Sequence, residues 1–281
     1  MLKIIVDGSA DMPEGWAELY QFDILPIPIQ IGERTYYEGE DITPDEFYRL
    51  VKDGDVHPQT AAPSPDKIMS FIENICELGD LVLSINVSGD MSSTVTMVKR
   101  AANALKDKIN VYPFDSKAGS AVLAFMAREA RLRERAGETI AEIQASLEAM
   151  KEQVMVVLTL DSLDFAYRSG RVGALQTLIT SLLKIKPVIS LQDGLLSVSD
   201  KVRTRKKSLE YLVTKIKDRF GMQPIRVAIV HSQDLETANI LNDMTNEVLN
   251  VVETIFTELA ISVAANLGPK TVGIVAIPEK I

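Results

Sequence analysis

The sequence predicts an α/β protein of two domains, and three of its features carry this prediction. Short apolar strands alternate with amphipathic helices through the first half of the chain, which is typical of a mostly parallel sheet with helices on both faces. The second half mixes a hairpin with helices, which is typical of a layered α+β domain with a mixed or antiparallel sheet. A length of 281 residues suits two domains better than one.

Apolar patterning and helix caps define the elements of the first half. Thr43 is expected to cap a helix, with Pro44 at its first position and Glu46 closing a capping box. Ser64 opens the next helix in the same way. Residues 24–29 contain two prolines, so they are expected to be extended but not central in a sheet. Strands are also expected at 4–6, 81–87 and 109–114, and helices at 92–105, 117–136 and 138–152.

The second half begins with an expected strand at 154–160 that carries the chain into the second domain. Asp193-Gly194 is the preferred pair for a type I′ turn, so residues 187–202 are expected to form a two-stranded hairpin. The boundary is expected near residue 155, which gives a Rossmann-like α/β domain at 1–155 and an α+β domain at 156–281. The further elements are a helical face of Leu175, Leu178, Ile179, Leu182 and Leu183, helices at 206–219 and 234–248, and strands at 225–230, 251–257 and 272–277.

Composition excludes several classes of function. A formal net charge of -9 argues against a nucleic-acid-binding protein, which would need a basic face. The single cysteine, Cys76, excludes an intrachain disulfide and a cysteine-based zinc site, and it fits a reducing cytoplasm. His57 and His231 are the only histidines, and they are far apart in the sequence. The sequence therefore argues against a histidine-based metal site or catalytic triad. We therefore expect no metal and no cofactor.

The sequence also lacks signals for export or membrane insertion. The first strand follows Met1 almost directly, without the long apolar core of a signal peptide. The apolar run at 154–158 is far shorter than the ~20 residues that a membrane helix needs. The expected location is the cytoplasm, without stable membrane insertion.

Polar loops repeatedly follow the expected strands of the first domain. Asp7-Gly8-Ser9, Ser88 to Thr94 and Asp115-Ser116 each come directly after a strand, and Thr60 precedes a helix start. Loops at the carboxyl ends of parallel strands line one crevice, and hydroxyl groups beside free helix N–H groups favour an anion. Each hydroxyl taken alone could equally be a helix cap, although Ser92-Ser93-Thr94 exceeds what one cap requires.

Three other residues are ambiguous. Asp7 and Asp115 could be metal ligands, general bases or turn formers, and His231 could be a catalyst or an ordinary residue at a strand end. A phosphate-binding glycine loop and a serine-hydrolase elbow are both absent from the sequence. The residues therefore favour an anion-binding protein over an enzyme.

Ser169-Gly170-Arg171 is the most informative short segment. A glycine just after a helix end can leave the next arginine facing inward, where its guanidinium can bind a carboxylate or phosphate through two hydrogen bonds. The alternative is a surface arginine after a helix cap.

Taken together in order, these segments resemble the DegV family of bacterial fatty-acid-binding proteins over nearly the whole chain. The resemblance implies a two-domain α/β fold that binds a long-chain fatty acid, of the palmitate, stearate or oleate type. It places the carboxylate at the domain interface and the acyl tail in an apolar tunnel. The segments are Val6 to Asp11, Pro58 to Ser64, Ser88 to Thr94, Phe114 to Ser116, Ser169 to Val172, Lys186-Pro187, Asp193-Gly194, Lys201 to Thr204 and Val230-His231.

The same resemblance assigns the ligand-binding residues. Thr60 and Ser92 match the hydroxyl groups that hold the carboxylate in the family, and Arg171 matches its glycine-backed arginine, which would neutralise the charge. Ser93 stands where the family usually has glycine, and we expect its side chain or backbone N–H to assist. Asn266 stands where the family usually has a histidine. An asparagine can hydrogen-bond a carboxylate, but it cannot carry a positive charge or shuttle a proton.

The resulting hypothesis is a lipid carrier that performs no chemical step of its own. Some members of the family present their acid to a fatty acid kinase, which is the candidate partner, although Asn266 separates this chain from their pattern. Two alternatives remain: an enzyme acting on a small phosphorylated or carboxylated metabolite through Asp7, Asp115 or His231, and a regulatory protein whose bound lipid is a signal.

Overall fold

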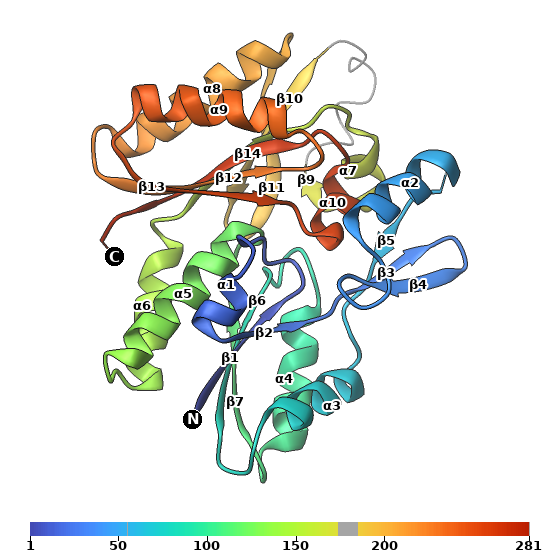
Figure 1. Ribbon diagram of the computed structural model, residues 1–281, viewed down its shortest axis with the longest axis vertical. Helices are drawn as coiled ribbons and strands as arrows, with labels where there is room; N and C mark the ends of the chain where they lie inside the picture. The colour runs from blue at the N-terminus through green and yellow to red at the C-terminus, as the bar shows by residue number, and fades with distance from the viewer. Residues whose placement is uncertain (55, 174–184, 281) are drawn as a thin grey trace. The chain divides into compact units, whose positions relative to one another are not determined.

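The structure is a computed structural model that describes residues 1–54, 56–173 and 185–280 (Figure 1). The chain divides into two compact units. The first unit contains Met1–Glu152 and Ala260–Ser262, and the second contains Gln153–Leu259 and Val263–Ile281. The helical face predicted at 175–183 lies outside the described residues.

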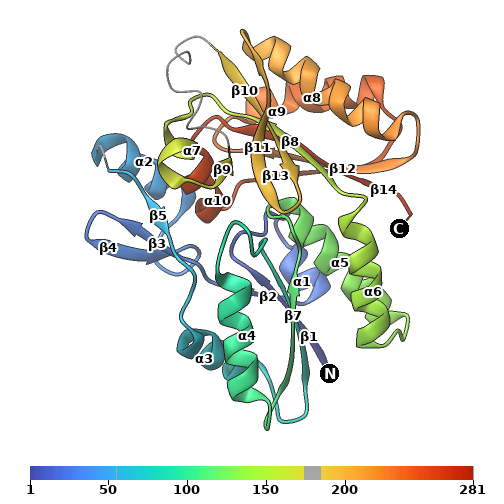
Figure 2. The ribbon, with the colours of Figure 1, turned by 180° about the vertical axis from the view of Figure 1, so that it is seen from behind.

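A four-stranded parallel sheet organises the first unit, in the order β2-β1-β6-β7. Helices α3 and α4 pack on one face through a cluster around Ile5, and α5 with α6 covers the other, as Figures 1 and 2 show. The elements of the sheet layer are β1 (Leu2–Asp7), α1 (Trp16–Tyr20), β2 (Phe22–Leu25), α3 (Pro65–Ile75), β6 (Leu81–Asn86), α4 (Thr94–Leu105), β7 (Asn110–Asp115), α5 (Ala121–Arg135) and α6 (Ile140–Lys151).

This strand order creates a switch point between β1 and β6. From β1 the chain first adds β2 on one side, and it later adds β6 and β7 on the other. The loops after β1 and β6 therefore diverge from neighbouring strand ends, which is where open α/β sheets bind ligands. The predicted parallel sheet and its covering helices are confirmed.

A small antiparallel sheet in the first unit was not predicted from the sequence. It has the order β4-β3-β5 and consists of β3 (Pro28–Ile31), β4 (Arg34–Tyr37) and β5 (Gln59–Thr60), with α2 (Pro44–Gly54) inserted before β5. The extended backbone expected at 24–29 is present, but it is divided between two sheets, because β2 ends at Leu25 and β3 begins at Pro28. Pro28 occupies the first position of a strand, where proline is tolerated.

Helix starts confirm the capping predictions where the signal is local. Thr43 and Glu46 form the expected reciprocal pair, with Glu46 N donating to Thr43 Oγ1 at 3.3 Å and Thr43 N donating to Glu46 Oε2 at 3.0 Å. Ser64 Oγ accepts from Lys67 N at 3.3 Å. By contrast, α5 begins four residues later than expected, because Lys117 and Ser120 adopt positive φ angles of 53° and 60°.

A seven-stranded mixed sheet organises the second unit, in the order β13-β12-β14-β8-β10-β11-β9. Helices α8 and α9 pack on it through a core that includes Leu212, Ile229 and Leu241. The elements are β8 (Met155–Thr159), α7 (Asp164–Ser169), β9 (Val172–Gly173), β10 (Lys186–Gln192), β11 (Leu195–Val202), α8 (Arg205–Phe220), β12 (Ile225–His231), α9 (Leu235–Val248), β13 (Val251–Glu258), α10 (Ile261–Leu267) and β14 (Val272–Pro278).

The predicted hairpin of the second unit is confirmed. β10 and β11 pair antiparallel around Asp193 and Gly194, whose φ angles of 49° and 82° fit a type I′ turn. Antiparallel pairs coexist with the parallel pairs β12–β13 and β11–β9. The predicted mixed sheet, and with it the predicted α/β fold class, is confirmed.

Candidate functional site

Asp7 joins two of the loops at the switch point of the parallel sheet. Its carboxylate is fully buried and accepts hydrogen bonds from Val87 N at 2.7 Å, Ser9 N at 3.1 Å and Ser9 Oγ at 2.5 Å. Burial raises the pKa of this carboxyl group above its ordinary value. Among the three roles open to Asp7 from the sequence, these contacts favour the turn former, since they occupy both oxygens.

Asp115 fixes the next loop in a similar way. Its Oδ1 accepts from Gly89 N at 3.1 Å and from Lys117 N at 2.9 Å. Lys117 Nζ lies 3.4 Å from Asp115 Oδ2 and 2.6 Å from Asp90 Oδ2, and hydrogen bonding to Asp90 raises the pKa of this lysine. Asp115 is therefore a scaffold for the loop that runs from Ser88 to Thr94.

That loop carries Ser92 and Ser93 at the start of α4. Ser92 Oγ accepts from Thr94 N at 3.2 Å and shares a 2.9 Å hydrogen bond with Thr94 Oγ1. Ser93 is the N-cap residue, yet its side chain makes no capping hydrogen bond. The structure thus places the two predicted serines at one helix start, where the Ser92 hydroxyl accepts from the first helical N–H and the Ser93 hydroxyl makes no capping bond.

Thr60 lies elsewhere in the same unit, in β5. It is half-buried and pairs with Ile29 of β3, and the next residue, Ala61, donates its N–H to Pro28 O at 3.2 Å. The sequence placed Thr60 in a loop before a helix, and this was wrong because β5 adds a third strand to the small antiparallel sheet.

Arg171 belongs to the second unit and follows α7 as predicted. Gly170 ends the helix in the left-handed conformation, with φ 67° and ψ 11°. Ser169 Oγ accepts from Arg171 N at 3.3 Å, and one guanidinium N–H of Arg171 donates to Ser169 O at 2.6 Å. The guanidinium is half-buried, and this bond uses one of its five N–H donors.

Asn266 is half-buried near the end of α10, in the second unit. Gly268, two residues later, has φ +85°, and a Cβ atom there would lie 2.8 Å from the ring of Phe165 in α7. Helices α7 and α10 are therefore packed together at this glycine. Arg171 follows the end of α7, and Asn266 lies in the last turn of α10, so each of these two helices carries a predicted binding residue near its C-terminal end.

His231 ends β12 and is 9% exposed. Its Nδ1 has no hydrogen-bond partner, and burial lowers the pKa of the imidazole. The ring is therefore neutral near pH 7. Within the described residues, no group of three acidic, histidine or cysteine side chains is arranged to hold a metal ion.

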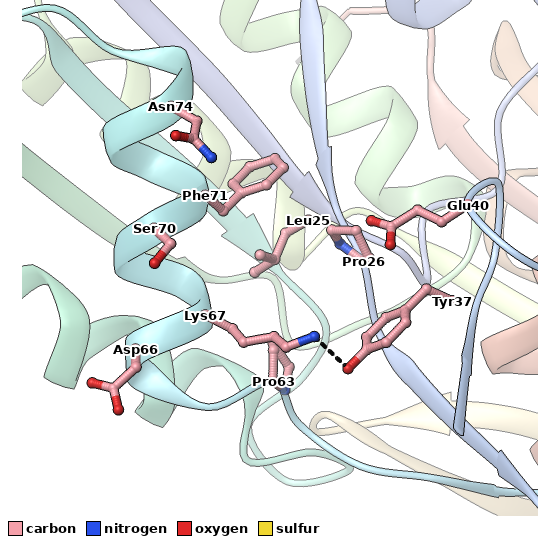
Figure 3. Close-up of a pocket in the computed structure, with 10 residues that line it drawn as sticks. All are labelled: Leu25, Pro26, Tyr37, Glu40, Pro63, Asp66, Lys67, Ser70, Phe71 and Asn74. Atoms are coloured by element: carbon pink, nitrogen blue, oxygen red, sulfur yellow. Dashed lines mark hydrogen bonds between the residues drawn. The ribbon is translucent and has the colours of Figure 1, made fainter. Parts of the chain in front are cut away.

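A separate pocket of about 420 Å³ lies in the first unit (Figure 3). Lys67 Nζ donates to the Tyr37 hydroxyl at 2.7 Å and lies 4.2 Å from the centre of its ring, so these two side chains meet inside the pocket. The predicted binding residues are not among those that line it, which are Leu25, Pro26, Tyr37, Glu40, Pro63, Asp66, Lys67, Ser70, Phe71 and Asn74.

Sequence reasoning did not single out Asp11 and Glu38, which bind residues near the end of the chain. Asp11 Oδ1 accepts from Ala260 N at 2.6 Å, and Glu38 Oε2 accepts from Ile261 N at 2.7 Å. The partners in these two contacts are separated by 249 and 223 positions in the sequence. Local sequence patterns therefore could not predict them.

The fold is that of an α/β protein of two units, and the polar loops after β1 and β6 lie at the switch point of its parallel sheet, where open α/β sheets bind ligands. The model of the DegV family, described as "Uncharacterised protein, DegV family", matches residues 1–279. The chain therefore belongs to the DegV family. No helix in the described part of the chain is long and apolar enough to span a membrane.

Relatives and solved structures agree with this assignment. Protein DegV of Bacillus subtilis is 29% identical over 247 residues, which is 87% of this chain and 88% of that protein. The structure is similar to a DegV family protein of Thermus thermophilus described for fatty acid binding, with a TM-score of 0.90, 27% identity and 99% of each chain covered. It is also similar to a stearic acid-binding protein of Eubacterium ventriosum, with a TM-score of 0.87, 25% identity and 99% of each chain covered.

Proposed function

We propose that this protein binds a long-chain fatty acid and carries it without chemical turnover. The observation that supports this most is the similarity of the whole chain to DegV structures that are described as binding fatty acids. The proposal includes a cytoplasmic location, for which the single cysteine is the support, and a fatty acid kinase as the candidate partner.

In this proposal five residues bind the carboxylate head group. Thr60 and Ser92 donate hydroxyl hydrogen bonds, Ser93 assists through its side chain or backbone N–H, Arg171 neutralises the charge and Asn266 donates an amide hydrogen bond. Ser93 suits this role because its hydroxyl is not used as a helix cap. Arg171 suits it because a guanidinium binds a carboxylate through two parallel hydrogen bonds.

Burial of the acyl tail would supply most of the affinity, at ~0.8 kcal/mol for each CH₂ group. The fixed polar groups would mainly set the orientation of the lipid. We further propose that the two units are separate domains, with the boundary near residue 155.

The first experiment identifies the ligand. Mass spectrometry of an organic extract of the purified protein should detect a long-chain fatty acid, and the delipidated protein should take up labelled palmitate or oleate. A protein that contains no acyl chain and takes up neither lipid would contradict the proposal.

The second experiment tests the head-group assignment. Arg171→Ala should weaken palmitate retention by roughly 10- to 100-fold, because it removes a charge-assisted hydrogen bond worth about 1.5–3 kcal/mol. Arg168→Ala is the matched control, since Arg168 is an exposed arginine in the last turn of α7, the helix that Arg171 follows. The penalty of Arg171→Ala should disappear for hexadecanol, which has no carboxylate. An equal loss for both lipids would show that Arg171 does not bind the head group.

A further inference from the structure

Three consecutive residues, Ala260 to Ser262, are each bound by side chains or backbone of the first unit. The backbone N–H groups of Ala260 and Ile261 donate to Asp11 and Glu38 at 2.6 and 2.7 Å. Ser262 Oγ donates to Gly8 O at 2.7 Å. We call Asp11, Glu38 and residues 260–262 the clasp. Since α10 begins at Ile261, the clasp holds the first N–H groups of the helix that carries Asn266.

Asp11 is the buried centre of the clasp. Its side chain is 2% exposed, and its second oxygen is hydrogen-bonded to Ser120 Oγ. Ser120 directly precedes α5 and has φ 60° and ψ -145°, a conformation that L residues rarely adopt. Its N–H donates to Ser9 O at 3.0 Å. The surroundings of Asp11 are therefore fixed from three segments of the first unit.

Burial of Asp11 disfavours its ionised form. Burial raises the pKa of Asp11 to about 8 and outweighs the hydrogen bonds from Ala260 and Ser120, which lower it, while the nearby carboxylate of Glu38 adds a smaller increase. Below this pKa the neutral carboxyl group can accept from Ala260 N and donate to Ser120 Oγ. Above it, a second negative charge appears beside Glu38 at a buried position.

We propose that Asp11 and Glu38 are positioning residues for α10, and that protonation of Asp11 controls how firmly they hold the helix. This inference rests on the proposed fatty-acid binding, because its functional consequence passes through Asn266. When the clasp closes, the first turn of α10 is fixed at residues 261 and 262, and Asn266 lies one turn beyond Ser262 on the same helix. When the clasp opens, water can hydrate an ionised Asp11.

The direction of the pH dependence follows from proton linkage. An open clasp leaves Asp11 with an ordinary pKa near 4, whereas the closed clasp holds its proton up to about pH 8. The closed form therefore binds more protons between these values, and it loses stability as the pH rises through this window. A lipid that favours the closed form must in turn raise the pKa of Asp11.

The pH profile of palmitate retention tests this inference on the full chain. For the wild type we expect retention to fall by roughly tenfold or more between pH 6 and pH 8.5, since linkage permits about tenfold for each pH unit. Asp11→Asn keeps an acceptor for Ala260 N–H and cannot ionise, so its profile should be flat. Glu38→Gln removes the neighbouring charge, so its profile should level off at a lower pH. Asp45→Asn, on the exposed side of α2, should follow the wild type.

Two outcomes would overturn the inference, and they are separable from failure of the proposed function. If wild type and Asp11→Asn bind palmitate with the same pH profile, lipid binding stands and the clasp has no role in it. If neither protein binds lipid at any pH, the proposed function fails. Hydrogen exchange at the Ala260 amide then tests separately whether the clasp depends on protonation of Asp11. Equal exchange in wild type and Asp11→Asn from pH 6 to 8.5 would then exclude a proton-dependent clasp, whereas faster exchange confined to the wild type would support it.

Discussion

At the scale of single residues, Gly89 is a sensitive position of the loop that carries Ser92 and Ser93. A Cβ atom there would lie 2.9 Å from Asp115 Oδ2 and 3.2 Å from Val95 Cγ1. Because Asp115 also accepts the Gly89 N–H, an alanine would push the loop away from the carboxylate that holds it. The position of this loop therefore depends on close contact between Gly89 and the Asp115 carboxylate.

We expect Gly89→Ala to destabilise the protein by about 1–3 kcal/mol, the usual cost of overpacking, and to weaken palmitate retention as well. Gly119→Ala is the control, because a Cβ atom at Gly119 would meet Val87 at an ordinary 3.5 Å. Urea denaturation measures the free energy of unfolding of both variants. Equal free energies of unfolding would contradict this account, because they would mean that the Asp115 side chain can move away from the new Cβ atom without destabilising the protein.

At the scale of secondary structure elements, β14 is the strand that holds the mixed sheet together. It pairs antiparallel with β12 on one side and with β8 on the other. Gly273 sits opposite Leu158 of β8, and a Cβ atom there would lie 2.7 Å from Leu158 Cβ and 2.8 Å from Val157 O. The two strands can approach this closely only because residue 273 has no side chain.

Gly273→Ala should therefore cost about 3 kcal/mol or more, since backbone atoms of β8 cannot rotate away as a flexible side chain can. Gly173→Ala in β9 provides the comparison, because its Cβ atom would lie 3.5 Å from Leu196 O. Thermal unfolding followed by circular dichroism should show a large decrease in Tm for Gly273→Ala alone. A similar Tm for both variants would contradict this account of the strand pair.

Elements were predictable where the signal is local. The capping pair Thr43–Glu46 and the turn Asp193-Gly194 each identify a structure within four residues, and both predictions are confirmed. The antiparallel sheet β4-β3-β5 was not predictable in this way. Its last strand contains only Gln59 and Thr60 and is separated from β4 by α2, so its pairing depends on tertiary contacts that no short pattern records.

At the scale of the whole molecule, the contact between Asp11 and Ala260 closes a loop of almost the entire chain. The two residues are 249 positions apart. Sequence reasoning could assign the family order of the binding segments, but it could not find this contact, because an alanine N–H leaves no mark in the sequence. The same limit applies to Ile261 and Glu38.

A double-mutant cycle measures what this long-range contact contributes. Asp11→Ala removes the acceptor, and Ala260→Pro removes the N–H donor at a position just before α10, where proline is tolerated. We expect the free energies of unfolding to show a coupling of about 1 kcal/mol or more, as for a buried hydrogen bond. Additive effects of the two substitutions would mean that the bond itself contributes nothing.

The position of β14 and of residues 260–262 also has a consequence for biosynthesis. A ribosome releases the N-terminal residues first, yet the first unit lacks its partners for Asp11 and Glu38 until residues 260–262 have been translated. The second unit lacks the strand between β12 and β8 until residues 272–278 follow. Neither unit can therefore complete its fold before these residues have been translated, and nascent chains that stop before residue 260 would present both units incomplete to chaperones and proteases.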